Sequence, residues 1–169
     1  MEVIEVTDFG PDEYGQIVDG EADPYGTDHL RMDWREKSGH VALVQDGRMI
    51  AHAGWVPADL RVASGEQLRI VGLGGVMVHR EHRGNGLGHR LVAETMARMG
   101  RLGRPVGMLF CRPQRVAFYE RLGWHPTGEP VTADQPGGPV VMPLMTCWTP
   151  FAEGAVLPHS ALHVEGLPF

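Results

Sequence analysis

The apolar residues of this chain change their spacing several times, and each change marks an expected element. Between residues 87 and 102 they recur every three to five positions, the spacing of one buried helical face. Before this helix, residues 70–78 form an apolar run that predicts a strand. Residues 40–45 and 49–56 are rich in β-formers, and Asp46-Gly47 between them predicts a hairpin turn. These segments predict a mixed domain of strands and helices.

The remaining segments are shorter. Residues 3–6 predict a first strand, and Pro11 begins a helix that runs to about Val18 with acids in its first turn. The segment 128–138 is rich in Pro and Gly and predicts a loop. The other expected elements are a short helix over 27–36 with Thr27 as N-cap, a strand over 106–111, a helix over 113–122, a last strand over 140–145 and a short strand over 162–164.

Composition narrows the class of protein. The chain has 169 residues, enough for one domain with a full core, and 43% of them are apolar. No apolar run approaches the roughly 20 residues of a membrane-spanning helix, and the N-terminus lacks the build of a signal peptide. The net charge of −6 argues against general nucleic-acid binding and is compatible with a cationic substrate. We therefore expect one cytoplasmic domain over 1–169, with residues 149–169 as a tail packed on it.

A Gly-rich loop lies between the predicted strand and the main helix. It reads Arg83-Gly84-Asn85-Gly86-Leu87-Gly88. Such a loop directs several backbone N–H groups at one point, at the positive end of the helix dipole, and the glycines let an anion approach closely. The sequence fits neither the dinucleotide fingerprint nor the phosphate loop that ends in Gly-Lys-Ser/Thr. The loop therefore predicts a phosphate site of another kind.

Two ordered motifs resemble the GNAT superfamily of acyl-CoA-dependent N-acyltransferases. The loop resembles its pyrophosphate-binding motif Arg-x-x-Gly-x-Gly/Ala, and residues 117–124 resemble its Phe-Tyr-x-x-x-Gly-Phe/Trp segment. The resemblance implies an α/β fold, a mixed central sheet flanked by helices, and acetyl-CoA as the acyl donor. By the same resemblance, the donor would lie where two parallel strands separate, and its binding residues would be Val76, Met77, Val78, Arg83, Gly84, Asn85, Gly86, Leu87 and Gly88.

The resemblance also implies a general acid. Tyr119 falls at the position of the superfamily's tyrosine that protonates the leaving thiolate, and a phenol with a pKa near 10 is protonated at pH 7. The alternative for Tyr119 is a core aromatic residue, and the two roles are compatible. The N–H near Val76 would stabilise the oxyanion. The strand lacks the acid that many members use as a base, so the candidates by position are His52, His79, Glu81 and His82, or a water chain.

Residues 25–145 further resemble the aminoglycoside 2′-N-acetyltransferases, with gaps. That resemblance implies a small-molecule amine as acceptor, with a cationic molecule such as an aminoglycoside as the expected class. Asp28 matches an acid that binds the sugar amines in that family, and Glu129, Asp134 and Phe169 are further candidates for acceptor binding. The central-strand acid is absent, since Gly74 stands there, which puts the aminoglycoside itself in doubt.

Other interpretations stay open. A non-catalytic protein that binds acyl-CoA as a sensor or subunit fits the missing base. The compact chain neither supports nor excludes a third alternative, an enzyme that acylates a protein or peptide N-terminus. We expect no metal, because His79-x-x-His82 follows a strand and has no visible third ligand. Cys111 and Cys147 form no disulfide framework, and Cys111 has no partnered base for nucleophilic catalysis. The sequence leaves the oligomeric state open, with a homodimer as one candidate.

Overall fold

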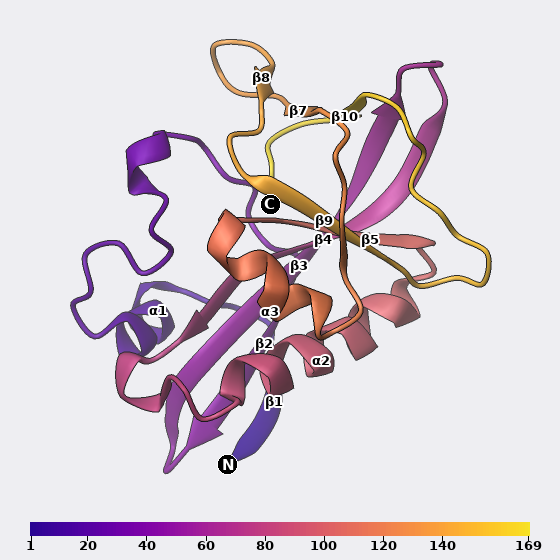
Figure 1. Ribbon diagram of the computed structural model, residues 1–169. Coiled ribbons are helices and arrows are strands. Elements are labelled where there is room, and N and C mark those ends of the chain that lie inside the picture. Colours follow the sequence, from indigo (N-terminus) through magenta and orange to yellow (C-terminus); the bar gives the residue numbers. More distant parts are fainter.

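A computed structural model describes residues 1–169, which form a mixed ten-stranded sheet with helices against it (Figure 1). The strand order is β6-β9-β5-β4-β3-β10-β7-β8, with β2 paired to β3 and β1 paired to β2. The strands are β1 (Glu2–Val6), β2 (Gly39–Gln45), β3 (Arg48–Val62), β4 (Gln67–Val78), β5 (Val106–Cys111), β6 (His125–Pro126), β7 (Val131–Ala133), β8 (Val140–Val141), β9 (Met145–Pro150) and β10 (Leu162–Val164). The predicted fold class, a mixed sheet flanked by helices, is confirmed.

The helices are α1 (Pro11–Val18), α2 (Leu87–Met99) and α3 (Val116–Glu120), with 3-10 turns η1 (Asp28–Leu30), η2 (Arg80–His82), η3 (Gly100–Leu102) and η4 (Pro113–Arg115). Ile17 of α1 packs with Met77 of β4, whereas Leu91 of α2 packs in the cluster that holds Leu73 of β4. An extra residue in β4 between Leu73 and Met77 turns these two side chains to opposite faces. Helices α1 and α2 therefore cover opposite faces of the sheet. None of the helices has the length and apolar character that a membrane crossing requires.

The strands β4 and β5 are parallel and separate after a few pairs. Their register runs from Ile70 opposite Val106 to Leu73 opposite Leu109 and ends there, while β5 stays paired with β9 up to Cys111. The last five residues of β4 therefore have no partner on the β5 side. This separation creates the space in which the site lies.

The predicted helix over 27–36 is wrong beyond its first turn. Only η1 forms, and the N-cap at Thr27 makes no side-chain hydrogen bond. The Asp23 carboxylate takes the place of the predicted cap, because it accepts hydrogen bonds from the N–H groups of Thr27 and Asp28. Further on, the N–H of Arg35 donates to the carbonyl of Pro168 and that of Ser38 to the carbonyl of Trp55. These tertiary hydrogen bonds hold the segment extended, which overrides its local helix propensity.

The predicted last strand is also displaced. Strand β8 ends at Val141, Pro143 supplies no ladder N–H, and the long strand β9 begins only at Met145. The predicted loop over 128–138 contains the short strand β7, which pairs in parallel with β10. Strand β10, at the predicted position, also pairs with β3, so the end of the chain lies on the sheet beside the central strands.

Candidate active site

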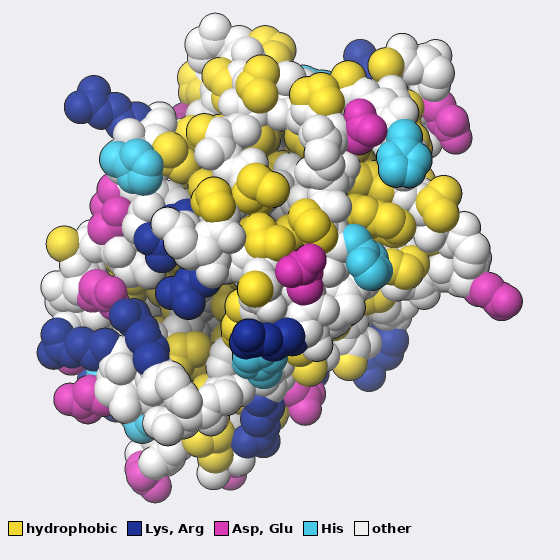
Figure 2. Space-filling model, viewed as in Figure 1, with side chains coloured by type: hydrophobic (Ala, Val, Ile, Leu, Met, Phe, Trp, Pro, Cys, Tyr) yellow, Lys and Arg dark blue, Asp and Glu magenta, His cyan; other side chains and the backbone are white.

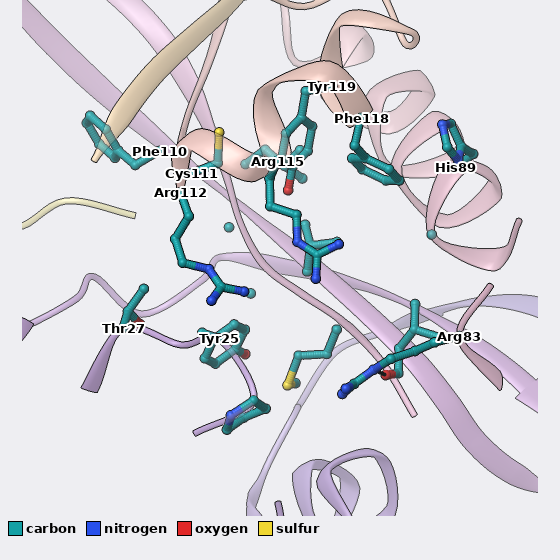
Figure 3. A pocket seen from close by; sticks show the side chains of 18 of the residues that line it. Tyr25, Thr27, Arg83, His89, Phe110, Cys111, Arg112, Arg115, Phe118 and Tyr119 are labelled. Atoms are coloured by element: carbon teal, nitrogen blue, oxygen red, sulfur yellow. Dashed lines mark hydrogen bonds between the residues drawn. The ribbon is translucent and has the colours of Figure 1, made fainter. Parts of the chain in front are cut away.

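A cavity of about 640 Å³ fills the separation between β4 and β5. It is lined by β4 and the loop after it (73–78, 82–84 and 86–89), by the segment before β2 (Pro24, Tyr25, Thr27, Trp34 and Lys37), by β5 and the residues that follow it (110–112, Arg115, Phe118 and Tyr119), and by Leu144 and Phe169. Figure 3 shows how these side chains surround it. Segments from across the whole sequence thus meet at one point.

One end of the cavity is the Gly-rich loop. Gly84 and Gly86 have φ angles of +82° and +76°, a backbone conformation that side chains with a Cβ rarely adopt, and α2 begins directly after Gly86. The first N–H groups of α2 therefore have no intrahelical partner and face this end of the cavity. Two hydrogen bonds hold the Arg83 side chain. Its Nη1 donates to Glu21 at 3.1 Å, and its Nε donates to the Val78 carbonyl at 2.8 Å.

A bulge in β4 lies in the middle of the cavity. The register passes from Gly54 opposite Gly74 to His52 opposite Met77, so β4 carries one extra residue, and Gly75 takes a φ of +62°. The carbonyl of Gly75 accepts a hydrogen bond from Nδ1 of His52 at 2.9 Å. Because a trans peptide directs its C=O and N–H to opposite sides, the N–H of Val76 points away from His52, toward the cavity that Val76 lines.

His52 is fixed in one tautomer. Its Nδ1 carries the proton because the Gly75 carbonyl can only accept, so its Nε2 is the acceptor for Nδ1 of His40 at 3.0 Å. The ring is only 2% exposed and stacks on Phe9 with a centroid separation of 3.6 Å. Burial first, and the neighbouring His40 and Lys37 as well, lower the pKa of His52 to about 4, against the opposing hydrogen bond to Gly75. His52 is a neutral hydrogen-bond donor to the bulge at neutral pH.

Tyr119 approaches the cavity from α3. Its side chain is 8% exposed, and its ring packs edge-on against Phe118 and Trp124. The hydroxyl group points into the cavity beside Arg115 (Figure 3). Burial raises the pKa of Tyr119, with a further contribution from Cys111, so the phenol holds its proton at neutral pH. Packing therefore fixes the ring while its polar end stays available to a ligand.

Lys37 lies over the strands at the other end of the cavity. Its Cγ stands 2.6 Å from where a Cβ on Gly54 would be, and its Cε 2.6 Å from where a Cβ on Gly74 would be. Gly54 and Gly74 face each other across β3 and β4, so this glycine pair makes the trough in which the lysine lies. Phe169 covers the next such position, at Gly72. Burial, and then the nearby Arg35, lower the pKa of Lys37 to about 8.

The charges around the cavity have one sign. No Asp or Glu lines it, although the chain has 21 acidic residues. Its cations are Lys37, Arg83, Arg112 and Arg115, and Lys and Arg side chains border the hollow in Figure 2. Arg83 is paired with Glu21, whereas Arg112 and Arg115 form no ion pair with an Asp or Glu side chain. Lys37 lies over Gly74 beside the main-chain carbon of Phe169. The cavity is thus suited to anionic ligands.

The structure brings together most of the residues predicted for the donor and the acid. The lining contains Tyr119, Val76, Met77, Val78, Arg83, Gly84, Gly86, Leu87 and Gly88, but not Asn85. Of the base candidates, only His82 lines the cavity, because His52 lies behind the bulge and His79 faces Asp19 at 3.5 Å. No group of His, Cys, Asp and Glu side chains has a geometry suited to a metal ion.

Only one of the four residues predicted to bind the acceptor lines the cavity. Phe169 lines the cavity, whereas the three acids do not. Asp28 is exposed on η1, Glu129 lies 3.6 Å from His159, and Asp134 accepts a hydrogen bond from the N–H of Gly166 at 2.7 Å. The sequence analysis missed Lys37. Its one visible signal was that Lys37 is the only lysine of the chain.

A family model described as an acetyltransferase (GNAT) domain matches residues 20–127, which is well over half of the chain. The chain belongs to the GNAT acetyltransferase family. The predicted superfamily is thereby confirmed, and the match covers both motifs and the strands between which the cavity opens. The cationic loop and the separated parallel strands of this GNAT domain are consistent with a site for acyl-CoA.

Among individual proteins, the uncharacterised N-acetyltransferase YhbS of Escherichia coli strain K12 is 30% identical over 95 residues, or 56% of this chain. That match spans 53% of YhbS, about half its length. The solved structure of E. coli YhbS with CoA shares the fold at a TM-score of 0.64 and 20% identity, covering 97% of this chain and 89% of that one. A GNAT family acetyltransferase from Brucella melitensis with acetyl-CoA has a TM-score of 0.56 at 18% identity, covering 95% and 94%.

Proposed function

We propose that this GNAT domain is an acetyl-CoA-dependent N-acetyltransferase that acts on the amine of a small molecule by direct transfer. One observation carries the proposal: the Gly-rich loop, the Val76 N–H and the Tyr119 hydroxyl belong to the same cavity at the end of the β4–β5 register. These are an anion site, an oxyanion donor and a proton donor in one space. Solved GNAT structures with CoA or acetyl-CoA support the choice of donor.

Bound acetyl-CoA would supply an acetyl thioester, and the chain's residues would act on it in turn. The loop around Gly84 and Gly86 holds the pyrophosphate, and main-chain groups of Val76 and Val78 hold the uncharged arm. The Val76 N–H stabilises the negative charge that develops on the thioester oxygen when the amine attacks. The new C–N bond forms, the C–S bond breaks, and Tyr119 gives its proton to the departing sulfur. The proton lost by the amine restores Tyr119, through water.

We infer that His52 is a positioning residue for this step. It does not line the cavity, but its hydrogen bond to the Gly75 carbonyl fixes the peptide plane that carries the Val76 N–H. An oxyanion donor acts well only when it is already aimed, because reorienting it during the reaction costs energy. The tail, residues 149–169, would act as part of this single domain by covering β4 with Phe169.

A second candidate function is donor binding without transfer. The observation that favours it is the absence of an Asp or Glu side chain from the cavity lining, which leaves the imidazoles of His82 and His89 as the side-chain bases there. An acceptor amine that is already neutral needs no strong base, so this absence is compatible with transfer as well.

Calorimetric titration with acetyl-CoA tests the donor site. We expect micromolar binding that Gly86→Ala weakens by about tenfold, because a Cβ strains the φ of +76° at the start of α2. The matched control is Gly103→Ala, which strains a similar φ of +67° outside the cavity and should bind as the wild type. Thiol release with a panel of amines then tests transfer. Binding with no thiol release for any amine would favour the second candidate, and no binding would contradict both.

A further inference from the structure

Tyr25 is a second phenol of the cavity, and it lies on the wall opposite Tyr119 (Figure 3). Its ring packs with Ile17, Val18 and Met77, on the face of the sheet that α1 covers. Tyr119 belongs to the cluster on the other face, which α2 covers. The two phenols therefore approach the cavity from opposite faces of the sheet.

The hydroxyl group of Tyr25 lies at the bulge of β4. Its oxygen is 3.7 Å from the place that a Cβ on Gly75 would occupy. The His52 ring reaches the same place, with its Cε1 at 3.3 Å and its Nδ1 at 3.6 Å. Tyr25 lines the cavity, whereas His52 does not. Of the two rings beside Gly75, the phenol is thus the one that can contact a ligand bound at the bulge.

Tyr25 holds its proton at neutral pH. Burial raises the pKa of its hydroxyl above the usual value of about 10, and the neighbouring Tyr14 makes a smaller contribution in the same direction. The phenol is therefore a neutral hydrogen-bond donor and not a general base. A neutral donor in a partly buried site can stabilise negative charge that develops on a nearby oxygen.

The segment that carries Tyr25 is held in a tight turn. The Asp23 carboxylate accepts a hydrogen bond from the N–H of Thr27 at 3.0 Å, and the Asp23 carbonyl accepts one from the N–H of Gly26 at 3.1 Å. Gly26 has a φ of +67°, and the Arg112 guanidinium lies where its Cβ would be. These contacts place the ring before a ligand binds. A donor to a developing oxyanion needs such placement, because reorienting it during the reaction costs energy.

The position of Tyr25 indicates which reacting atom it would contact. The thioester oxygen would lie at the N–H of Val76, the residue directly after Gly75. The sulfur would lie toward the Tyr119 hydroxyl on the other wall. The acceptor amine would enter at the end lined by Phe169, the one predicted acceptor residue in the cavity. A phenol beside Gly75 is therefore placed to contact the oxygen.

We propose that Tyr25 is a catalytic residue whose hydroxyl donates a second hydrogen bond to the thioester oxygen, beside the Val76 N–H. The proposal rests on the proposed transferase function and adds a residue to it. When the amine attacks, the C–N bond forms and the carbonyl electron pair moves to the oxygen, where both hydrogen bonds stabilise it. The pair returns as the C–S bond breaks and the sulfur takes the proton of Tyr119. Tyr25 keeps its own proton throughout.

Infrared difference spectroscopy of bound acetyl-CoA, isotope-labelled at the thioester carbonyl, tests this contact without an acceptor. A hydrogen bond weakens the C=O bond, so the carbonyl stretch should lie at lower wavenumber on the wild type than on Tyr25→Phe. On the variant it should stay below that of free acetyl-CoA, because the Val76 N–H remains. Tyr14→Phe removes a neighbouring hydroxyl outside the cavity lining and should give the wild-type frequency.

Steady-state thiol release is the second measurement. With an amine that the wild type acetylates, kcat should fall about 10- to 100-fold in Tyr25→Phe, because one oxyanion donor is lost and the other remains. The KM for the amine and the affinity for acetyl-CoA should stay within about threefold of the wild type, since the lost contact strengthens chiefly as charge develops. Tyr14→Phe should again match the wild type.

The same carbonyl frequency on the wild type and Tyr25→Phe would overturn the proposal, and so would an equal change in Tyr14→Phe. An amine KM that rises while kcat is unchanged would show that Tyr25 contacts the acceptor, which also overturns it. Wild-type thiol release by Tyr25→Phe would overturn the proposal and leave the transferase standing. A carbonyl shift that depends on Tyr25, without thiol release for any amine, would leave the contact standing and contradict the transferase.

Discussion

The two ends of the cavity are built in different ways. The donor end is one continuous stretch, from the bulge at Gly75 through the loop to the start of α2, and its glycines have the φ angles that such a backbone needs. The proposed acceptor end is assembled from residues far apart in the chain. Lys37 and Phe169 lie over glycines of β4, and Arg112 lies against Gly26. The comparison teaches that the proposed donor site depends on local backbone geometry and the proposed acceptor site on tertiary packing. The chemistry of the proposed reaction lies between them.

The largest effect is expected at the junction of the two ends. Tyr119→Phe keeps the packing of the ring and removes the proton donor, so kcat should fall by about 100-fold or more while acetyl-CoA affinity stays the same. Steady-state thiol release and calorimetry measure the two quantities. Tyr14→Phe, on the exposed side of α1, is the matched control and should leave kcat unchanged. A kcat within threefold of the wild type in Tyr119→Phe would remove Tyr119 from the role of general acid.

The histidine pair behind the bulge should make stability depend on pH. The pKa of His52 is about 4 in the folded protein and ordinarily about 6.5, so the unfolded chain takes up a proton between these values and the folded protein does not. The stability from neutral His52 is complete above pH 6.5 and declines as the pH falls, by about 3 kcal/mol at pH 4. The pKa of His40 is also lowered, mainly by burial, and acts in the same direction.

Urea unfolding at several pH values measures this dependence. The free energy of unfolding of the wild type should fall more steeply between pH 6.5 and pH 4 than that of His52→Leu, which has no proton to take up there. The groups that face His52 are His40, Lys37 and the Gly75 carbonyl, and all three remain in the variant. Parallel curves for the two proteins would show that His52 titrates normally and would contradict the buried neutral tautomer.

Two variants of His52 distinguish a role in orienting the Val76 N–H from a role in packing alone. In His52→Leu the Gly75 carbonyl loses its donor, so we expect kcat to fall about tenfold with little change in acetyl-CoA affinity. In His52→Asn the amide nitrogen stands near the place of Nδ1 and should restore most of that loss. If His52→Asn is as slow as His52→Leu, the hydrogen bond to Gly75 does not aim the oxyanion donor.

The comparison of the two ends also explains what the sequence could predict. The segment from Arg83 to Gly88 was recognisable because glycines at fixed spacing between a strand and a helix have a local physical meaning. Helix α2 followed from the spacing of its apolar residues, strand β4 from an apolar run, and the hairpin of β2 and β3 from β-formers on both sides of Asp46-Gly47. Each of these depends on residues that are neighbours in the chain.

The acceptor end could not be predicted in this way. The helix expected over 27–36 fails because Arg35 and Ser38 hydrogen-bond to Pro168 and Trp55, partners that no local pattern reveals. Gly74 suggested only a missing acid, whereas in the structure Gly74 and Gly54 make room for a lysine from another segment. We expected acids to bind the acceptor from their positions in the chain. In the structure, Asp134 instead accepts a hydrogen bond from the N–H of Gly166 in the tail, and Glu129 lies beside His159.

The smallest effect is expected at the rim of the donor end, where Arg83 pairs with Glu21. Glu21 holds Arg83 through two hydrogen bonds, and the pKa of Glu21 is lowered chiefly by its hydrogen bond to Arg83. A bound pyrophosphate would compete with Glu21 for the same guanidinium, so Glu21→Gln should tighten acetyl-CoA binding. The pair is largely exposed, and such pairs are weak, so we expect a gain of about two- to fivefold. Titration at low and high salt checks this, since the gain should shrink as salt screens the pair. Weaker binding in Glu21→Gln would instead show that Glu21 orients Arg83 for the phosphates, and the rim would then be preorganised like the rest of the donor end.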